Sequence, residues 1–247
     1  MFPIRDHNPS GRTPFVTYAL MAINIVVFLA MFDMTDRELL QVYWDYALLP
    51  GRISEGDGFA GLITSMFLHG GFMHLAGNML FLFIFGDNIE DEMGHLPYLG
   101  FYLASGLAAG FLQYASGPGS MIPVVGASGA IAGVMGGYLL LFPKARVDIL
   151  VIFVVFFKVF PIPAWITLGL WFGLQIYGGF GTPGDEGGVA YWAHAGGFIA
   201  GIILAFPLWQ RLGGIRFWDR TDGHPPHPEA TYPLARTSIP KAGRRRR

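Results

Sequence analysis

Two long stretches without a charged side chain limit what this chain can become. Phe15–Phe32 and Phe59–Phe85 contain no Asp, Glu, Lys or Arg. About 20 consecutive apolar residues are enough to cross the hydrocarbon core of a bilayer as a helix. Only 13% of the residues are charged, which is about half the share of a typical soluble domain. The sequence therefore predicts a membrane protein.

Prolines, glycine-rich links and short charged turns divide the chain into six apolar segments. We expect an all-α polytopic membrane protein whose spanning helices lie at 15–32, 71–86, 96–114, 128–142, 164–177 and 190–209. The domain organisation that follows is a cytoplasmic N-terminal segment, 1–14, a six-helix core, 15–209, and a polar C-terminal tail, 210–247. The tail is rich in prolines and charged residues, so we expect it to be disordered. The chain contains no cysteine, which excludes disulfides and thiol chemistry.

The connecting segments have distinct compositions. Asp33–Asp57 mixes acids with aromatic residues and predicts short helices at the membrane interface. Asp87–Gly94 predicts a tight polar turn. Val147–Phe160 is rich in Val, Ile and Phe and predicts a short β-hairpin. Gly178–Gly188 predicts a flexible glycine-rich loop.

The distribution of positive charge predicts the orientation. With the N-terminus inside, only Arg37 and Arg52 of the 16 Lys and Arg residues fall on the outer side. Cytoplasmic segments of membrane proteins carry an excess of these residues. We therefore expect a multi-pass protein of the cell membrane with both termini in the cytoplasm. The Arg244–Arg247 cluster either stays solvated or contacts anionic lipids.

This topology brings polar side chains from three helices to one depth near the outer face. Ser128 begins the fourth span, and His194 lies about one turn inside the sixth. His74 and Asn78 lie near the outer end of the second span. Polar groups at membrane depth are costly and mark functional sites. Their convergence predicts an active site.

Gly126-Ala127-Ser128-Gly129 places a serine between glycines where a helix begins. A serine hydroxyl becomes a nucleophile when a histidine takes its proton. The unpaired N–H groups of a helix N-terminus stabilise an oxyanion, and Gly126 and Gly129 allow close approach to the backbone. The alternative is that Ser128 only caps the helix, which is a common role of serine.

Small residues recur every fourth position in the helices that carry Ser128 and His194. They are Gly129, Gly133 and Gly137 in the fourth span, and Ala193, Gly197 and Gly201 in the sixth. This spacing lets helix backbones pack closely in lipid, which would bring the two side chains within reach. The alternatives are glycine packing without chemistry, a hydrogen-bonded core histidine, or a histidine in a transport path.

His74 and Asn78 are four residues apart and share one helical face. Both can donate hydrogen bonds to a developing oxyanion. His69 lies off that face, so we assign it a structural or loop role. A metal site from His69, His74 and His194 lacks the His-Glu-x-x-His pattern, and we expect neither a metal nor a cofactor. The acids of Asp87–Glu92 fall at the cytoplasmic end, so a Ser–His dyad is expected.

With these motifs the chain resembles the rhomboid family of intramembrane serine proteases. The likeness covers residues 15–209 and rests on Gly126-Ala127-Ser128-Gly129, His74-x-x-x-Asn78 and Ala193-His194-x-x-Gly197-x-x-x-Gly201. It implies a six-transmembrane-helix bundle in which Ser128 is the nucleophile and His194 the general base.

The resemblance implies roles for other residues as well. His74, Asn78 and the Ser128 N–H would form the oxyanion hole, with His69, Gly126, Gly129 and Gly197 in supporting positions. Asp33–Asp57 matches the family's membrane-embedded loop, and Gly178–Gly188 resembles its flexible cap. Some members carry an aromatic residue against the catalytic histidine one turn after the serine, where this chain has Ala132.

The implied activity is hydrolysis of peptide bonds in or near transmembrane segments of other proteins, through an acyl-enzyme. The implied partners are these substrates and the bilayer, with no nucleic acid. A helix hides its carbonyls in hydrogen bonds, so we expect substrates with helix-weakening residues and a small side chain before the cleaved bond. The alternatives are a catalytically silent relative that binds transmembrane clients, and a transporter that uses a histidine path.

Overall fold

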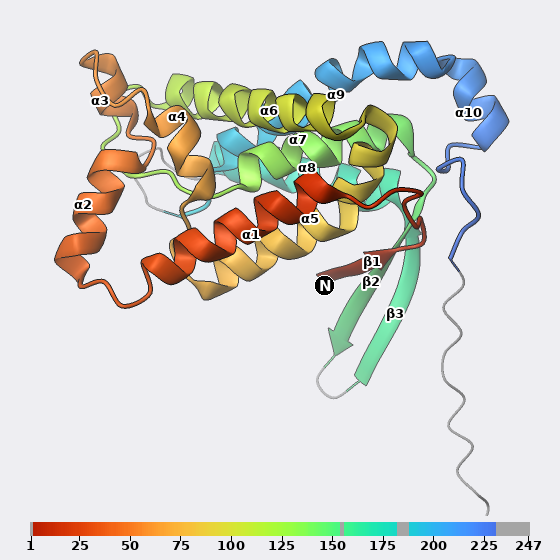
Figure 1. The fold of residues 1–247 in the computed structure, drawn as a ribbon, viewed down its shortest axis with the longest axis horizontal. Helices are drawn as coiled ribbons and strands as arrows, with labels where there is room; N and C mark the ends of the chain where they lie inside the picture. The colour runs from red at the N-terminus through yellow and green to blue at the C-terminus, as the bar shows by residue number, and fades with distance from the viewer. Residues whose placement is uncertain (1, 154–155, 182–187, 231–247) are drawn as a thin grey trace, which may run out of the picture.

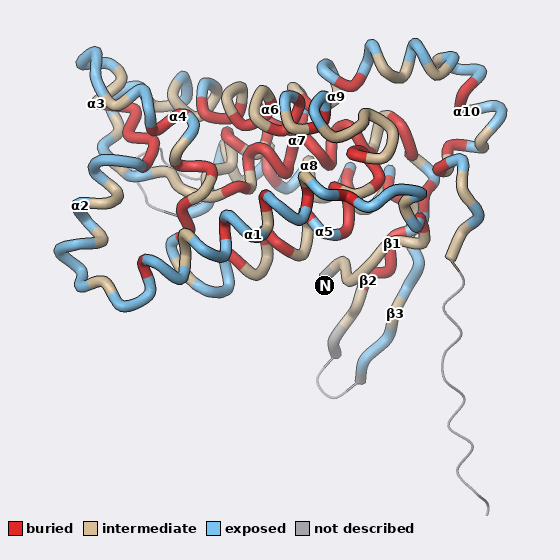
Figure 2. The backbone as a smooth tube through the Cα atoms, in the orientation of Figure 1, coloured by how far each residue is buried: buried red, intermediate tan, exposed pale blue. Residues whose placement is uncertain are grey.

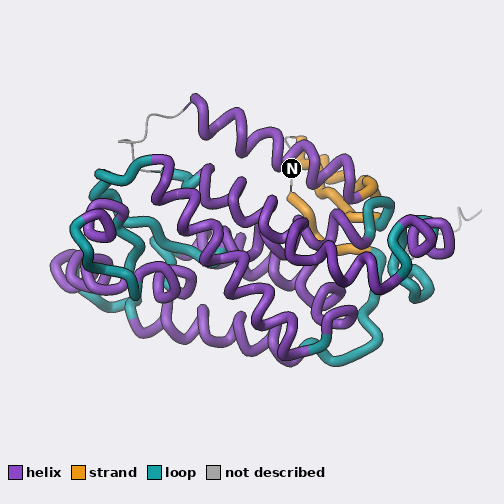
Figure 3. Tube along the Cα trace, turned by 90° about the horizontal axis from the view of Figure 1, so that it is seen from above, coloured by secondary structure: helices purple, strands orange, loops and turns teal. Residues whose placement is uncertain are grey.

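The computed structural model describes residues 2–153, 156–181 and 188–230. Long helices form a bundle with a small sheet at one end and short helices at the other (Figures 1 and 3). The long helices are α1 (Phe15–Ala30), α5 (Phe72–Met93), α6 (His95–Ser116), α7 (Ser128–Leu141), α8 (Ala164–Gly181) and α9 (Tyr191–Leu212). Each predicted span therefore contains a helix.

The long helices differ in whether their length and composition are sufficient to cross a membrane. Among the described residues, α5 and α9 are long and apolar enough to cross a membrane, whereas α1 and α7 are apolar but shorter. Large apolar side chains remain exposed on the outer faces of the bundle, including Val26 on α1, Leu170 on α8 and Ile203 on α9. Membrane crossing by all six helices stays a prediction.

Helix α7 forms the centre of the bundle (Figure 2). Most of its residues are buried, and it packs most extensively against α9. The contact is between backbones: a methyl group at Gly197 would lie 1.9 Å from the carbonyl oxygen of Gly129. A methyl group at Gly201 would lie 1.9 Å from the carbonyl oxygen of Gly133. Only glycine fits at these two crossing points.

The short helices predicted within Asp33–Asp57 are present as α2 (Asp36–Tyr46) and α3 (Pro50–Ser54). Two further short helices, α4 (Gly61–Thr64) and η1 (Ser65–Phe67), follow them before α5 and were not predicted. Helix α2 begins with a capping box, in which Thr35 and Glu38 satisfy each other's backbone N–H groups. Leu48 joins this region to the segment before α7 by pairing with Val124.

The predicted hairpin is confirmed, and the N-terminal segment adds a third strand to it. Strands β1 (Phe2–Asp6), β2 (Arg146–Phe153) and β3 (Phe156–Pro163) form an antiparallel sheet in that order. The carboxylate of Asp6 accepts hydrogen bonds of 3.0 Å from Asn88 and from Tyr138. Burial, with the nearby Asp87, raises the pKa of Asp6 to about 7. The expected all-α fold is thus corrected to a mostly helical one, because the polar N-terminal lead forms strand β1 and its Asp6 bonds to α5 and α7.

One further expectation was wrong. Asp87–Gly94 is not a turn, because α5 continues to Met93. There Glu90 is buried and accepts backbone N–H groups of Val16 and Thr17, each at 2.8 Å, which anchors the start of α1.

The C-terminal tail is also ordered where the structure describes it. Helix α9 continues to Leu212, and α10 (Ile215–Thr221) follows with Phe217 buried. The rest of the tail, 231–247, including Arg244–Arg247, lies outside the described residues, as do residues 182–187 of the predicted cap. The described start of that cap segment, to Gly181, belongs to α8.

We predict that Gly201→Ala destabilises the protein, because its methyl group would overlap the Gly133 carbonyl oxygen. Overpacking of this kind costs about 1–3 kcal/mol, so the midpoint of thermal unfolding in detergent should fall by several degrees. Gly173→Ala in α8 is the matched control, since no atom lies within 4 Å of its added methyl group. Equal midpoints for the two variants would contradict the close backbone contact.

Candidate active site

Ser128 is the first residue of α7, and its side chain is partly exposed. The N-cap position belongs to Ala127, and no side chain of the described residues caps this helix. The capping role considered for Ser128 therefore does not apply. The first N–H groups of α7, including that of Ser128 itself, lack partners within the helix.

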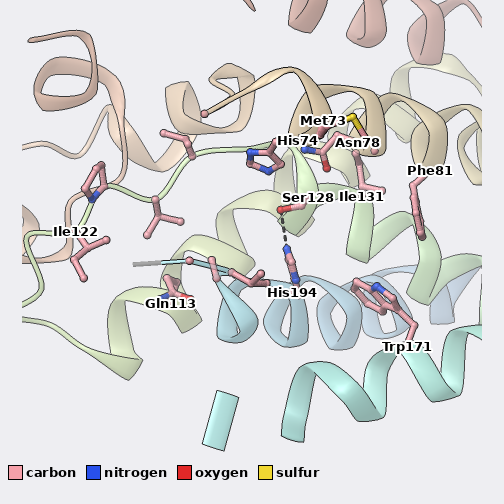
Figure 4. Close-up of a pocket in the computed structure, with 18 of the residues that line it drawn as sticks. Met73, His74, Asn78, Phe81, Gln113, Ile122, Ser128, Ile131, Trp171 and His194 are labelled. Atoms are coloured by element: carbon pink, nitrogen blue, oxygen red, sulfur yellow. Dashed lines mark hydrogen bonds between the residues drawn. The ribbon is translucent and has the colours of Figure 1, made fainter. Parts of the chain in front are cut away.

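His194 lies within hydrogen-bonding distance of this serine. Its Nε2 is 2.8 Å from the Ser128 Oγ (Figure 4). The start of α9 is held in place from α6, because the Ala193 N–H donates to Gln113 Oε1 at 3.1 Å. The first glycine contact between α7 and α9 joins Gly129, which follows Ser128, to Gly197, three residues after His194. The two side chains are 66 positions apart and meet because their helices pack backbone to backbone.

A cavity of about 510 Å³ lies beside this pair. Its polar lining includes His74, Asn78 and Gln113. Its apolar lining includes Phe81 and Trp171 (Figure 4). A cavity of this size with a few converging polar groups is typical of a ligand or active site.

His74 and Asn78 approach Ser128 from α5, on the side opposite His194 in Figure 4. Asn78 is buried, and its Nδ2 has no hydrogen-bond partner among the described residues. An unpaired buried amide costs free energy. Its place in the cavity wall leaves this donor available to a ligand.

Gly126 and His69 shape the surroundings of His74. Gly126 has a φ of +125°, and a methyl group there would lie 2.7 Å from the His74 Nε2. Glycine is therefore required both by the backbone and by the histidine. The ring of His69 is buried and packs edge-on against His74, with centroids 5.1 Å apart. Burial, with His74 as a second cause, lowers the pKa of His69 to about 4.

The sequence prediction missed two residues that contact His194. Its Nδ1 is 2.8 Å from Gln175 Oε1, and its ring lies 5.7 Å from that of Trp171. Both residues come from α8. Trp171 therefore provides an aromatic neighbour for His194, which the fully buried Ala132, one turn after Ser128, does not provide. A polar amide within an apolar helix was the available signal for Gln175.

Metal binding finds no support in the described part of the chain. There, no group of three or more His, Cys, Asp or Glu residues is arranged to hold an ion. His69, His74 and His194 do not form such a group.

Comparison with known proteins identifies the family of this chain. Residues 57–211 match the Rhomboid domain. The chain belongs to the rhomboid family. Rhomboid proteins are membrane proteins, which agrees with the apolar helices described above.

Individual relatives each match part of the chain. The chain is 31% identical over 201 residues to Rhomboid protein 1, mitochondrial, of Saccharomyces cerevisiae, covering 77% of this chain and 52% of that protein. It is 31% identical over 159 residues to RHOMBOID-like protein 5 of Arabidopsis thaliana, covering 64% and 47%. It is 33% identical over 129 residues to Rhomboid protease GluP of Bacillus subtilis, covering 51% and 24%. The chain thus spans about half the length of the first two relatives.

Proposed function

We propose that this rhomboid protein is an intramembrane serine endopeptidase that uses Ser128 and His194 as a catalytic dyad. The 2.8 Å contact between Ser128 Oγ and His194 Nε2 carries the proposal. Supporting observations are the adjoining cavity and the protease name of one relative, GluP.

The first half of the reaction is acyl transfer. Ser128 Oγ attacks the scissile carbonyl carbon while its proton passes to His194 Nε2. The tetrahedral intermediate collapses, the C–N bond breaks, and the leaving amine takes the proton from His194. One substrate fragment leaves as an amine, and the other stays bound to Ser128 as an ester.

The second half is hydrolysis of this ester. Water gives a proton to His194 and attacks the ester carbonyl carbon. The C–Oγ bond then breaks, Ser128 recovers its proton, and the second fragment leaves as a carboxylic acid. In both halves the negative oxygen would receive hydrogen bonds from Asn78 Nδ2, His74 and the Ser128 backbone N–H.

The proposed membrane arrangement has six spans: α1, α5, α6, α7, α8 and α9, with both termini in the cytoplasm. Helix α7 has 14 residues, about 21 Å at 1.5 Å per residue, whereas the hydrocarbon core is about 30 Å thick. Ser128 at its outer end would therefore lie below the outer surface. This depth suits the hydrolysis of bonds in or near transmembrane segments.

The proposed substrates are transmembrane proteins whose helices unwind near the site. Only an unwound segment can offer its carbonyl carbon to Ser128. The catalytically silent alternative needs the cavity for binding alone. It gives no reason for an aligned serine and histidine beside an unpaired amide donor, so proteolysis is favoured. The cell membrane stays the predicted location.

The dyad predicts that either partner alone is insufficient. Purified protein in liposomes is mixed with a labelled transmembrane substrate, and fragments are quantified over time. Ser128→Ala and His194→Ala should each abolish detectable cleavage, because one removes the nucleophile and the other its base.

Ser105→Ala is the matched control for this assay. Ser105 is fully buried in α6 and its hydroxyl has no partner among the described residues, so cleavage should continue near the wild-type rate. Wild-type cleavage by either dyad variant would refute the assignment.

The oxyanion role of Asn78 makes a separate prediction. Asn78→Ala should lower kcat by about 10²–10³-fold, because one donor to the oxyanion is lost, and KM should change little. Asn24→Ala, which removes a buried amide on α1, is the control and should keep kcat. An unchanged kcat in Asn78→Ala would assign that amide to structure alone.

A further inference from the structure

We propose that Gln175 is a third, positioning member of the site, which holds His194 in the tautomer that accepts the serine proton. The proposal rests on the proposed protease function. It deepens that function by adding a residue from α8 to a pair carried by α7 and α9.

The hydrogen bonds of Gln175 define which way its amide points. Its Nε2 lies 3.2 Å from the Trp171 carbonyl oxygen. A carbonyl only accepts, so the NH₂ group must face Trp171 and the oxygen must face His194. Gln175 is buried, with 8% of its surface exposed, which protects both bonds from competing water.

The oxygen of Gln175 decides where the imidazole carries its proton. Oε1 is 2.8 Å from His194 Nδ1 and has no proton to donate. The neutral ring therefore holds its hydrogen on Nδ1. Its Nε2 keeps a lone pair, which points to the Ser128 hydroxyl at 2.8 Å. The opposite tautomer would turn the Nδ1 lone pair toward Gln175 Oε1, so that two acceptors would face each other and neither would have a donor.

A glutamine suits this position better than an acid would. An ionised carboxylate buried at membrane depth is costly, whereas a neutral amide fixes the tautomer without a net charge. The second contact from α8, the ring of Trp171, limits tilting of the imidazole. Gln175 and Trp171, one turn apart on α8, thus fix which ring nitrogen of His194 is protonated and how the ring is oriented.

A packing role for Gln175 predicts a different order of variants. Gln175→Met keeps the size of the side chain but removes the amide acceptor. Gln175→Glu keeps an acceptor in either protonation state, because a protonated carboxyl can also donate to Trp171. If Gln175 only fills space, Gln175→Met should be the more active variant. If Gln175 positions His194, Gln175→Glu should be the more active one.

The experiment first reads the tautomer without any substrate. Long-range ¹H–¹⁵N correlation spectra are recorded on ¹⁵N-histidine-labelled wild-type protein, and His194 is assigned by comparison with His194→Ala. We expect the proton on Nδ1. A wild-type ring protonated on Nε2 would overturn the proposal, whether or not the protein proves to be a protease.

Kinetics and spectra of the variants complete the test. Gln175→Met should lower kcat by about 10- to 100-fold with KM little changed, and should lose the preference for Nδ1–H. Gln175→Glu should retain Nδ1–H and exceed Gln175→Met in kcat. Leu174→Met, at the neighbouring exposed position, is the control and should match the wild type. Wild-type kcat in Gln175→Met, or a higher kcat in Met than in Glu, would overturn the proposal while leaving the Ser–His dyad intact.

Discussion

The backbone contact between α7 and α9 determines where the groups of the candidate site lie. Gly197 packs against the carbonyl oxygen of Gly129. Gly129 follows Ser128 by one residue on α7, and Gly197 follows His194 by three residues on α9. Each methyl group added there would push the helices apart, and a hydrogen bond of 2.8 Å tolerates little displacement. The glycines therefore set the distance on which the serine–histidine contact depends.

Much of this architecture could be predicted from local sequence. Charge-free runs located the helices because burial in lipid demands apolar side chains over a fixed length. The spacing of Gly129 and Gly133 against Gly197 and Gly201 predicted the close helix pair. Gly137, the third glycine of the α7 series, does not make the same contact with α9. A methyl group there would meet Phe101 of α6 first, at 3.0 Å.

The features that were missed depend on long-range pairing. Strand β1 looked like a polar lead because its partner β2 lies more than 140 positions away. The acids of Asp87–Glu92 resembled a turn, although Glu90 is buried against the start of α1. Gln175 could be recognised as an unusual polar residue, but only the packing of α8 on α9 shows which nitrogen of His194 it contacts.

The central claim is that His194 activates Ser128, and covalent labelling tests it most directly. A fluorophosphonate forms a bond from the attacking serine oxygen to phosphorus as fluoride leaves, and peptide mass spectrometry locates the modified residue. The dyad predicts modification of Ser128 in the wild-type protein and little or none in His194→Ala. Modification of another serine in place of Ser128, or undiminished labelling of Ser128 in His194→Ala, would contradict it.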